Sequence, residues 1–216
     1  MKFLKPISII AILFLSLILI SFSTQKESQE RRPVTENQVA YFASGCFWCV
    51  EAIFESVYGV EEAVSGYAGG FTENPTYKTI GTGKTGHSET VAVYYNPKLV
   101  SFETLVAVFF ASHNPTTMNG QYPDYGTQYR SIAFYTSTKE KVIIEVAIST
   151  LNKTVYKGKI ATEVTKLKKF YEAEAYHQNF EKRNPNQSYV KAVSIPRLNK
   201  FKKKMPNVLK KAARLH

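Results

Sequence analysis

Apolar and polar residues alternate in some segments of this chain and recur with helical spacing in others. Residues 38–43, QVAYFA, are rich in apolar and aromatic side chains, which is typical of a short strand. From residue 47 to residue 57 the apolar side chains recur mostly at three-residue spacing, which predicts an amphipathic helix. Residues 60–70 then indicate a strand that ends in glycines, and residues 89–97 an alternating strand that ends at a turn.

The rest of the chain continues this mixture of strands and helices. We predict, in chain order, a helix over 102–113 capped by Ser101, a strand over 129–137, a helix over 139–153 capped by Thr138, a strand within 159–170 and a short helix within 172–185. Two long polar loops, 71–88 and 114–128, separate some of these elements, and loops of this length are often functional. Because strands and helices mix and no repeat is visible, we expect one domain of the α/β or α+β class.

Composition and charge refine this picture. Hydrophobic residues make up 44% of the 216 residues and charged residues 21%, which indicates a packed core. The net charge is +11, but residues 25–195 hold 18 Lys and Arg against 17 Asp and Glu, whereas residues 196–216 hold eight Lys and Arg and no acid. We expect 196–216 to be a solvated basic tail, with binding to anionic lipid headgroups as the alternative. No nucleic-acid motif is present, so no nucleic-acid partner is expected.

The N-terminal segment is predicted to be a targeting signal. Residues 1–23 contain Lys2 and Lys5, an uncharged apolar run and a small-residue pattern at its end, which is typical of a signal peptide. An uncleaved membrane anchor is the alternative, since the run is slightly long for a signal peptide. Residues 24–37 are polar and indicate a linker. We therefore expect export to the periplasm or cell envelope, with membrane contact through this segment if it is retained.

The sequence GCFWC places both cysteines of the chain, Cys46 and Cys49, at the start of the first predicted helix. Two cysteines and scattered histidines do not complete a zinc site, so no metal is expected. A structural disulfide over so small a loop would gain little entropy. A helix N-terminus stabilises a thiolate, which predicts a reactive Cys46, with Cys49 one turn later and within reach of an oxidised Cys46. A thioredoxin-like dithiol and an oxygen-accepting thiol fit this pattern equally well.

Four blocks of the sequence decide between these chemistries. They are GCFWCVE at 45–51, NPTYKTIGTGKTGHSETVAVYYNP at 74–97, DYGTQYRSIAFY at 124–135 and FYEAEAYHQNFEKRNP at 170–185. In order and content they resemble the signature segments of the peptide methionine sulfoxide reductase A family, whose members reduce the S-epimer of methionine sulfoxide. The resemblance implies a catalytic domain over 38–195 with a two-layer α/β sandwich, a mixed sheet and a ferredoxin-like core.

The resemblance also implies roles for individual residues. Cys46 would be the nucleophile, and Glu89 would donate a proton to the sulfoxide oxygen, for which burial must raise its pKa. Tyr77 and Tyr129 would hydrogen-bond that oxygen.

Three further positions complete the implied site. Asp124 would help to position it, and Phe47 and Trp48 would form an apolar wall for the substrate methyl group. Four other residues of the matching blocks are expected to support the structure: Glu51, His87, Arg130 and His177.

The chain departs from the commonest family pattern at Cys49, where many members have glycine and carry resolving cysteines in the C-terminal tail. With two cysteines in the chain, we expect Cys49 to convert a sulfenic acid on Cys46 to a disulfide, which thioredoxin or a similar external dithiol would reduce. No cofactor is then needed. Oxidised proteins and free methionine sulfoxide are the expected substrates, and a monomer is expected. The alternative classes are a general thiol–disulfide oxidoreductase and a module that binds lipid through the basic tail.

Overall fold

The computed structural model describes residues 38–214. The predicted signal segment 1–23 and the linker 24–37 lie outside the described residues. None of the helices within 38–214 combines the length and the apolar character needed to cross a bilayer.

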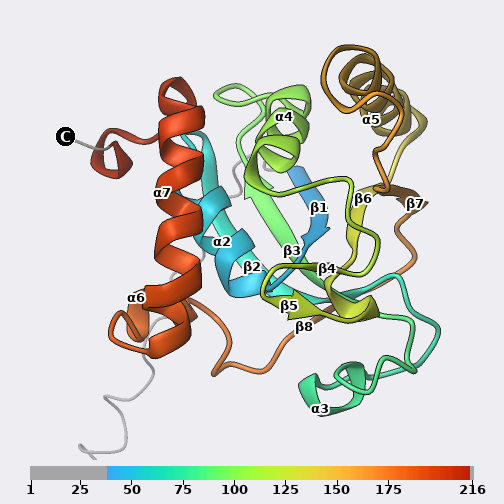
Figure 1. Cartoon of the computed structure of the whole chain (residues 1–216), viewed down its shortest axis with the longest axis vertical. Coiled ribbons are helices and arrows are strands. Elements are labelled where there is room, and N and C mark those ends of the chain that lie inside the picture. The colour runs from blue at the N-terminus through green and yellow to red at the C-terminus, as the bar shows by residue number, and fades with distance from the viewer. Residues whose placement is uncertain (1–37, 215–216) are drawn as a thin grey trace, which may run out of the picture. The chain divides into compact units, whose positions relative to one another are not determined.

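A six-stranded sheet forms the centre of the domain, with strand order β7-β6-β1-β3-β2-β8 (Figure 1). Its strands are β1 (Gln38–Ser44), β2 (Val60–Ala68), β3 (Ser88–Tyr95), β6 (Ser131–Tyr135), β7 (Glu163–Lys166) and β8 (Phe170–Glu172). β7 pairs with β6 in parallel, and the other pairs are antiparallel, so the sheet is mixed as predicted.

The four central strands, β6-β1-β3-β2, have ferredoxin-like connectivity. Helix α2 (Phe47–Glu55) links β1 to β2, and helix α4 (Phe102–Ser112) links β3 to β6. Both helices pack on the same face of the sheet, because Phe42 of β1 stacks on Phe54 of α2 and on Phe109 of α4, with ring centroids 5.1 Å apart in each pair. The predicted class and core are therefore confirmed.

Two helix starts test the capping predictions. Ser101 caps α4 as predicted, since its hydroxyl accepts a hydrogen bond from the Thr104 N–H at 3.2 Å. Helix α5 (Thr138–Leu151), which continues as the π-turn η2 (Asn152–Tyr156), is capped by Ser137, so the prediction of Thr138 was wrong by one residue. Ser137 is the cap because its hydroxyl accepts the Glu140 N–H at 3.2 Å, and the Glu140 carboxylate in turn accepts the Thr136 N–H at 2.6 Å.

Both predicted loops contain short elements that periodicity does not reveal. The first contains α3 (Tyr77–Ile80), and the second contains the hairpin β4 (Gly120–Gln121) and β5 (Asp124–Tyr125) and the 3-10 turn η1 (Thr127–Tyr129). The helix that forms within 172–185 is the short α6 (Phe180–Arg183). The segment before α6 is held against β2 instead, because the Gln178 side chain accepts a hydrogen bond from the Ser65 N–H and donates one to the Ser65 carbonyl, at 2.9 Å each.

The C-terminal segment belongs to the domain, which corrects the boundary expected at residue 195. It forms η3 (Val190–Ser194), α7 (Ile195–Lys204), η4 (Pro206–Val208) and η5 (Lys211–Ala213). Phe201 and Leu209 are buried in the main core, and the backbone of Leu209 bridges to Val57 after α2. The high charge of this segment predicts a solvated tail. In the structure its few apolar residues point inward, while its lysines lie at the surface.

Candidate active site

A sharp turn after β1 places Cys46 at the N-terminus of α2. Gly45 makes this turn with a φ of +89°, and Cys46 is the N-cap residue of the helix. A Cβ atom on Gly45 would lie 2.8 Å from the Cβ of Gln121, so both the backbone angle and the close approach of β4 require glycine. The packing of β4 against this turn thus fixes where the Cys46 side chain emerges.

The two thiols are free, buried and hydrogen-bonded to each other. Burial and the neighbouring Cys49 raise the pKa of Cys46 well above its ordinary value. The pKa of Cys49 is lowered to about 6 by the hydrogen bond from Cys46, by the charge of Arg197 and by Ser194, whose hydroxyl lies 3.1 Å from the Cys49 sulfur. Both shifts favour a proton on Cys46 and a charge on Cys49, whereas the helix N-terminus alone would favour a thiolate at Cys46.

Glu89 of β3 explains why the helix N-terminus does not ionise Cys46. Its Oε2 accepts a hydrogen bond at 2.9 Å from the backbone N–H of Phe47, the first residue of α2. The carboxyl group thus occupies a donor that an isolated helix start would offer to a thiolate. Burial raises the pKa of Glu89 to about 8, against the opposing effect of this bond. Glu89 is therefore mostly protonated at neutral pH, as its predicted role requires.

Tyr77, Tyr129 and Asp124 lie within electrostatic range of Glu89, so the structure brings the predicted polar residues together. Tyr77 begins α3, and Tyr129 ends the turn η1 that follows Asp124. Burial and the charge of Glu89 raise the pKa of Tyr77 to about 12 and also raise that of Tyr129. Both phenols keep their protons at neutral pH, so both can donate hydrogen bonds to an oxygen near Cys46.

Tyr189 is a site residue that the sequence analysis missed. Its hydroxyl donates a short hydrogen bond to Oδ2 of Asp124 and also lies within hydrogen-bond reach of Cys46 and Cys49. Its ring meets that of Trp48 edge-on, with centroids 6.0 Å apart. Tyr189 thus connects Asp124 to the thiol pair from a segment just before the presumed tail, where no motif distinguishes it from the other tyrosines.

Arg197 is the second missed residue, hidden in the basic run of α7. Its Nη2 donates to the backbone oxygen of Ser44 at 2.8 Å, and its Nε donates to that of Ser112 at 3.0 Å. The guanidinium thus ties α7 to the end of β1, immediately before the catalytic turn. From this position its charge helps to lower the pKa of Cys49.

The two aromatic residues between the cysteines have different surroundings. Phe47 is fully buried and packs against Tyr67, Tyr77 and His177. Trp48 is half-buried; its ring stacks on Phe180 at 3.8 Å, and its Nε1–H donates to Nδ1 of His177 at 3.2 Å. Burial lowers the pKa of His177, which keeps this ring nitrogen available as an acceptor. His177 therefore orients the indole beside the thiol pair.

The remaining residues of the matching blocks hold the surrounding segments in place. Glu51 accepts hydrogen bonds from the Ser65 hydroxyl and the Asn179 N–H, both at 2.5 Å. His87 accepts from the Gly70 N–H and bonds the Thr72 carbonyl. Arg130 pairs with Glu163 at 2.9 Å and also bonds the carbonyls of Thr127 and Gly86. Their contacts support the structural roles expected for them.

The site thus places a protonated carboxylic acid and two phenols close to a pair of thiols that share one proton. Such a site can protonate an oxygen atom while a neighbouring sulfur attacks the atom that carries it. Within residues 38–214 no group of three or more His, Cys, Asp or Glu is arranged to hold a metal ion.

Known proteins share this sequence over most of its length. Residues 38–209 match the family described as peptide methionine sulfoxide reductase. The peptide methionine sulfoxide reductase MsrA of Trichodesmium erythraeum is 49% identical over 164 residues, which cover 76% of this chain and 93% of that protein. The MsrA of Pasteurella multocida is 45% identical over 173 residues, which cover 80% of this chain and 99% of that protein.

Solved structures share the fold as well. Methionine sulfoxide reductase A of Corynebacterium diphtheriae has a TM-score of 0.65 and 34% identity, covering 73% of this chain and 78% of that one. Mxr1 from Saccharomyces cerevisiae in its reduced form has a TM-score of 0.66 and 33% identity, covering 72% of this chain and 90% of that one. By sequence and by fold, the chain belongs to the peptide methionine sulfoxide reductase A family.

Proposed function

We propose that this chain, a peptide-methionine (S)-S-oxide reductase by family, uses Cys46 as the nucleophile and Glu89 as the proton donor. The observation that carries this assignment is the buried Glu89 carboxyl group, hydrogen-bonded to the residue after Cys46 and with a pKa of about 8. An acid of this kind is protonated near neutral pH and can transfer its proton when the sulfoxide oxygen departs.

In the first step the Cys46 sulfur attacks the substrate. Cys46 passes its proton to the Cys49 thiolate, with which it shares a hydrogen bond, and attacks the sulfoxide sulfur. Glu89 protonates the sulfoxide oxygen, and Tyr77 and Tyr129 donate hydrogen bonds to it. The oxygen passes to Cys46, so that Cys46 becomes a sulfenic acid and methionine leaves. The Cys46 sulfur is oxidised by two electrons, and the substrate sulfur is reduced by two.

In the second step Cys49 resolves the sulfenic acid. The Cys49 sulfur attacks Cys46 and forms the disulfide, the proton of Cys49 passes to the departing hydroxide, which leaves as water, and Glu89 regains its proton from solvent. With one proton taken up from solvent, the cycle thus converts one thiol, one thiolate and one sulfoxide to one disulfide, one methionine and one water. The hydrogen bond between the two thiols supports this direct attack. Phe47 and Trp48 supply an apolar contact for the substrate methyl group.

A mass measurement after one equivalent of methionine S-sulfoxide tests this assignment. The wild-type protein should lose two hydrogens, mapped to Cys46 and Cys49. The Cys49→Ser variant should gain one oxygen on Cys46 and release about one methionine per enzyme without turning over again. With excess sulfoxide and thioredoxin, a Cys49→Ser variant that released methionine as fast as the wild type would remove Cys49 from the cycle. A general thiol–disulfide oxidoreductase would form mixed disulfides and release no methionine.

The Cys46–Cys49 disulfide needs an external dithiol, and thioredoxin or a thioredoxin-like protein is the proposed donor. We further propose that the chain acts outside the inner membrane on oxidised proteins and free methionine sulfoxide. The support for export is the signal-like sequence of residues 1–23, which lies outside the described residues. Fractionation of cells that express the full chain tests it, since a cytosolic protein of full mass would contradict export.

A further inference from the structure

A cleft of about 650 Å³ lies between α7 and the segment that joins α4 to β5. Arg197, Lys200 and Lys204 line one wall. Their spacing of three and four residues places them on one face of α7. Lys204 is packed closely enough that burial and the charge of Lys200 lower its pKa. Lys200 and Lys204 are both exposed, so the cleft concentrates positive charge at the surface of the domain.

Little negative charge offsets these cations. Asp124 is the one acidic residue that lines the cleft, and Tyr189 already donates a hydrogen bond to it. Within residues 38–214 neither Lys200 nor Lys204 forms an ion pair, and Lys204 has a long contact of 3.4 Å to the Ala111 carbonyl. Like charges held close together repel one another, and the charge of Lys200 helps to lower the pKa of Lys204. An anionic ligand would relieve this repulsion.

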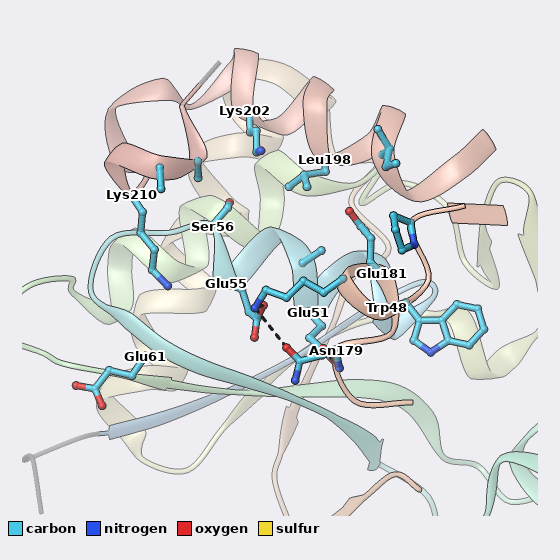
Figure 2. A pocket seen from close by; sticks show the side chains of 16 residues that line it. Trp48, Glu51, Glu55, Ser56, Glu61, Asn179, Glu181, Leu198, Lys202 and Lys210 are labelled. Carbon is cyan, nitrogen blue, oxygen red and sulfur yellow. Dashed lines mark hydrogen bonds and ion pairs between the residues drawn. The ribbon is translucent and has the colours of Figure 1, made fainter. Parts of the chain in front are cut away.

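The cavity of about 510 Å³ on the other side of α7 provides the contrast (Figure 2). Lys202 points into it beside two further lysines, and four carboxyl groups also line it: Glu51, Glu55, Glu61 and Glu181. Lys182 forms an ion pair with Glu55 at 3.0 Å. The lysines of that cavity thus have several acidic neighbours, whereas Asp124 is the one acidic residue among the described residues that line the cleft.

The cleft begins close to the reacting thiol. The Nη1 atom of Arg197 lies 3.3 Å from the position of a Cβ on Gly45, the residue before Cys46. A helix rises about 1.5 Å per residue, so Lys200 and Lys204 follow about 5 Å and about 10 Å farther along α7. An extended polypeptide advances about 3.3 Å per residue. A chain whose methionine sulfoxide contacts Cys46 can therefore place a side chain about two to five residues away beside these lysines.

We propose that this cleft binds a carboxylate side chain of the polypeptide substrate, so that the enzyme prefers methionine sulfoxides with Asp or Glu about two to five residues away. This inference rests on the proposed function, because it assigns a substrate class to the same site. The substrate is favoured over a partner protein because Asp124 lines the cleft and Arg197, on its wall, reaches the turn at Gly45 that carries Cys46.

Blocked peptides that contain one methionine S-sulfoxide test the preference, with a small dithiol as the reductant so that no partner protein takes part. The peptides carry Glu, Gln or Lys at the flanking positions and have no terminal charges. At low salt the Glu peptide should have a kcat/KM about fivefold above that of the Gln peptide, mostly through KM, and the Lys peptide should fall below it. The difference should shrink at about 0.5 M salt.

Lys200→Glu should abolish or reverse the preference, and Lys200→Gln should abolish it. Lys203→Glu is the matched control, because Lys203 is an exposed residue of the same helix that lines neither cavity, and it should keep the preference. Equal rates for all peptides in the wild type, or equal effects of the two charge reversals, would overturn the inference. Failure of the wild type to reduce even the Gln peptide would instead contradict the proposed function.

Discussion

Oε2 of Glu89 accepts the backbone N–H of Phe47 at 2.9 Å, so the buried acid is held at the helix start that carries Cys46. This bond fixes the carboxyl group beside the thiol, and burial keeps its proton in place up to about pH 8. The acid is thus positioned by a backbone group that no substitution of Phe47 other than proline removes.

Replacing Glu89 by Gln should lower the rate of methionine release about 10²- to 10⁴-fold, because the oxygen loses its proton donor while the bond from Phe47 can still form. In the wild type, the rate should fall as pH rises through about 8, where Glu89 loses its proton. Single-turnover rates across pH measure both effects. A wild-type profile that stayed flat from pH 6 to about 9 would assign the proton to another group.

The same substitution should stabilise the folded protein. The pKa of Glu89 is raised in the folded state, so the folded state binds this proton more tightly than the unfolded state. Its contribution is present at low pH and is lost as pH rises from about 4.5 towards about 8. Urea unfolding at pH 8 should find Glu89→Gln more stable than the wild type by about 1–3 kcal/mol. At pH 4 the two proteins should unfold alike.

Arg197 should set the thiolate content of the reduced pair. The ultraviolet absorbance of thiolate should titrate in the wild type with a midpoint near 6, which we assign to Cys49. Arg197→Gln should raise this midpoint by about one unit, because a nearby positive charge favours the thiolate. Arg197→Lys keeps the charge and should leave the midpoint nearly unchanged. If the thiolate absorbance of Cys49→Ser also titrated with a midpoint near 6, the resting charge would belong to Cys46.

Tyr189→Phe tests the connection between Asp124 and the thiols. Loss of the hydroxyl leaves the Asp124 carboxylate without its partner, so we expect a stability loss of about 1–3 kcal/mol and a slower reaction with an altered pH profile. Tyr122→Phe is the control, because Tyr122 is exposed on the turn of the neighbouring hairpin, and it should match the wild type. If both variants had the stability and the reaction rate of the wild type, the Tyr189 hydroxyl would have no role in the site.

The C-terminal segment should behave as core. Phe201→Ala should cost about 3–5 kcal/mol of unfolding free energy, because Phe201 is 1% exposed and packs in the main cluster. Lys203→Ala on the same helix should change the stability by less than about 0.5 kcal/mol. Denaturant unfolding of both variants measures these free energies. An unchanged free energy of unfolding for Phe201→Ala would support a solvated tail instead.

Several features of the fold could be predicted because they depend on neighbours in the chain. The apolar spacing over 47–57 predicted α2, and Ser101 capped α4 through its own local hydrogen bond. The predicted helix over 172–185 was mostly wrong because its local pattern was overridden by contacts with a distant strand, with Gln178 bonded to Ser65.

The sequence by itself determined the chemical groups: the two cysteines at a helix start, an acid, two tyrosines and the family to which they belong. Only the tertiary structure decided which thiol carries the resting charge, because that depends on burial and on groups more than 140 residues away. Ser194 and Arg197 reach Cys49 and Ser44 from the basic segment that seemed detached from the domain. Electrostatic energy depends on distance in space and on exclusion of water, and neither can be read from separation along the chain.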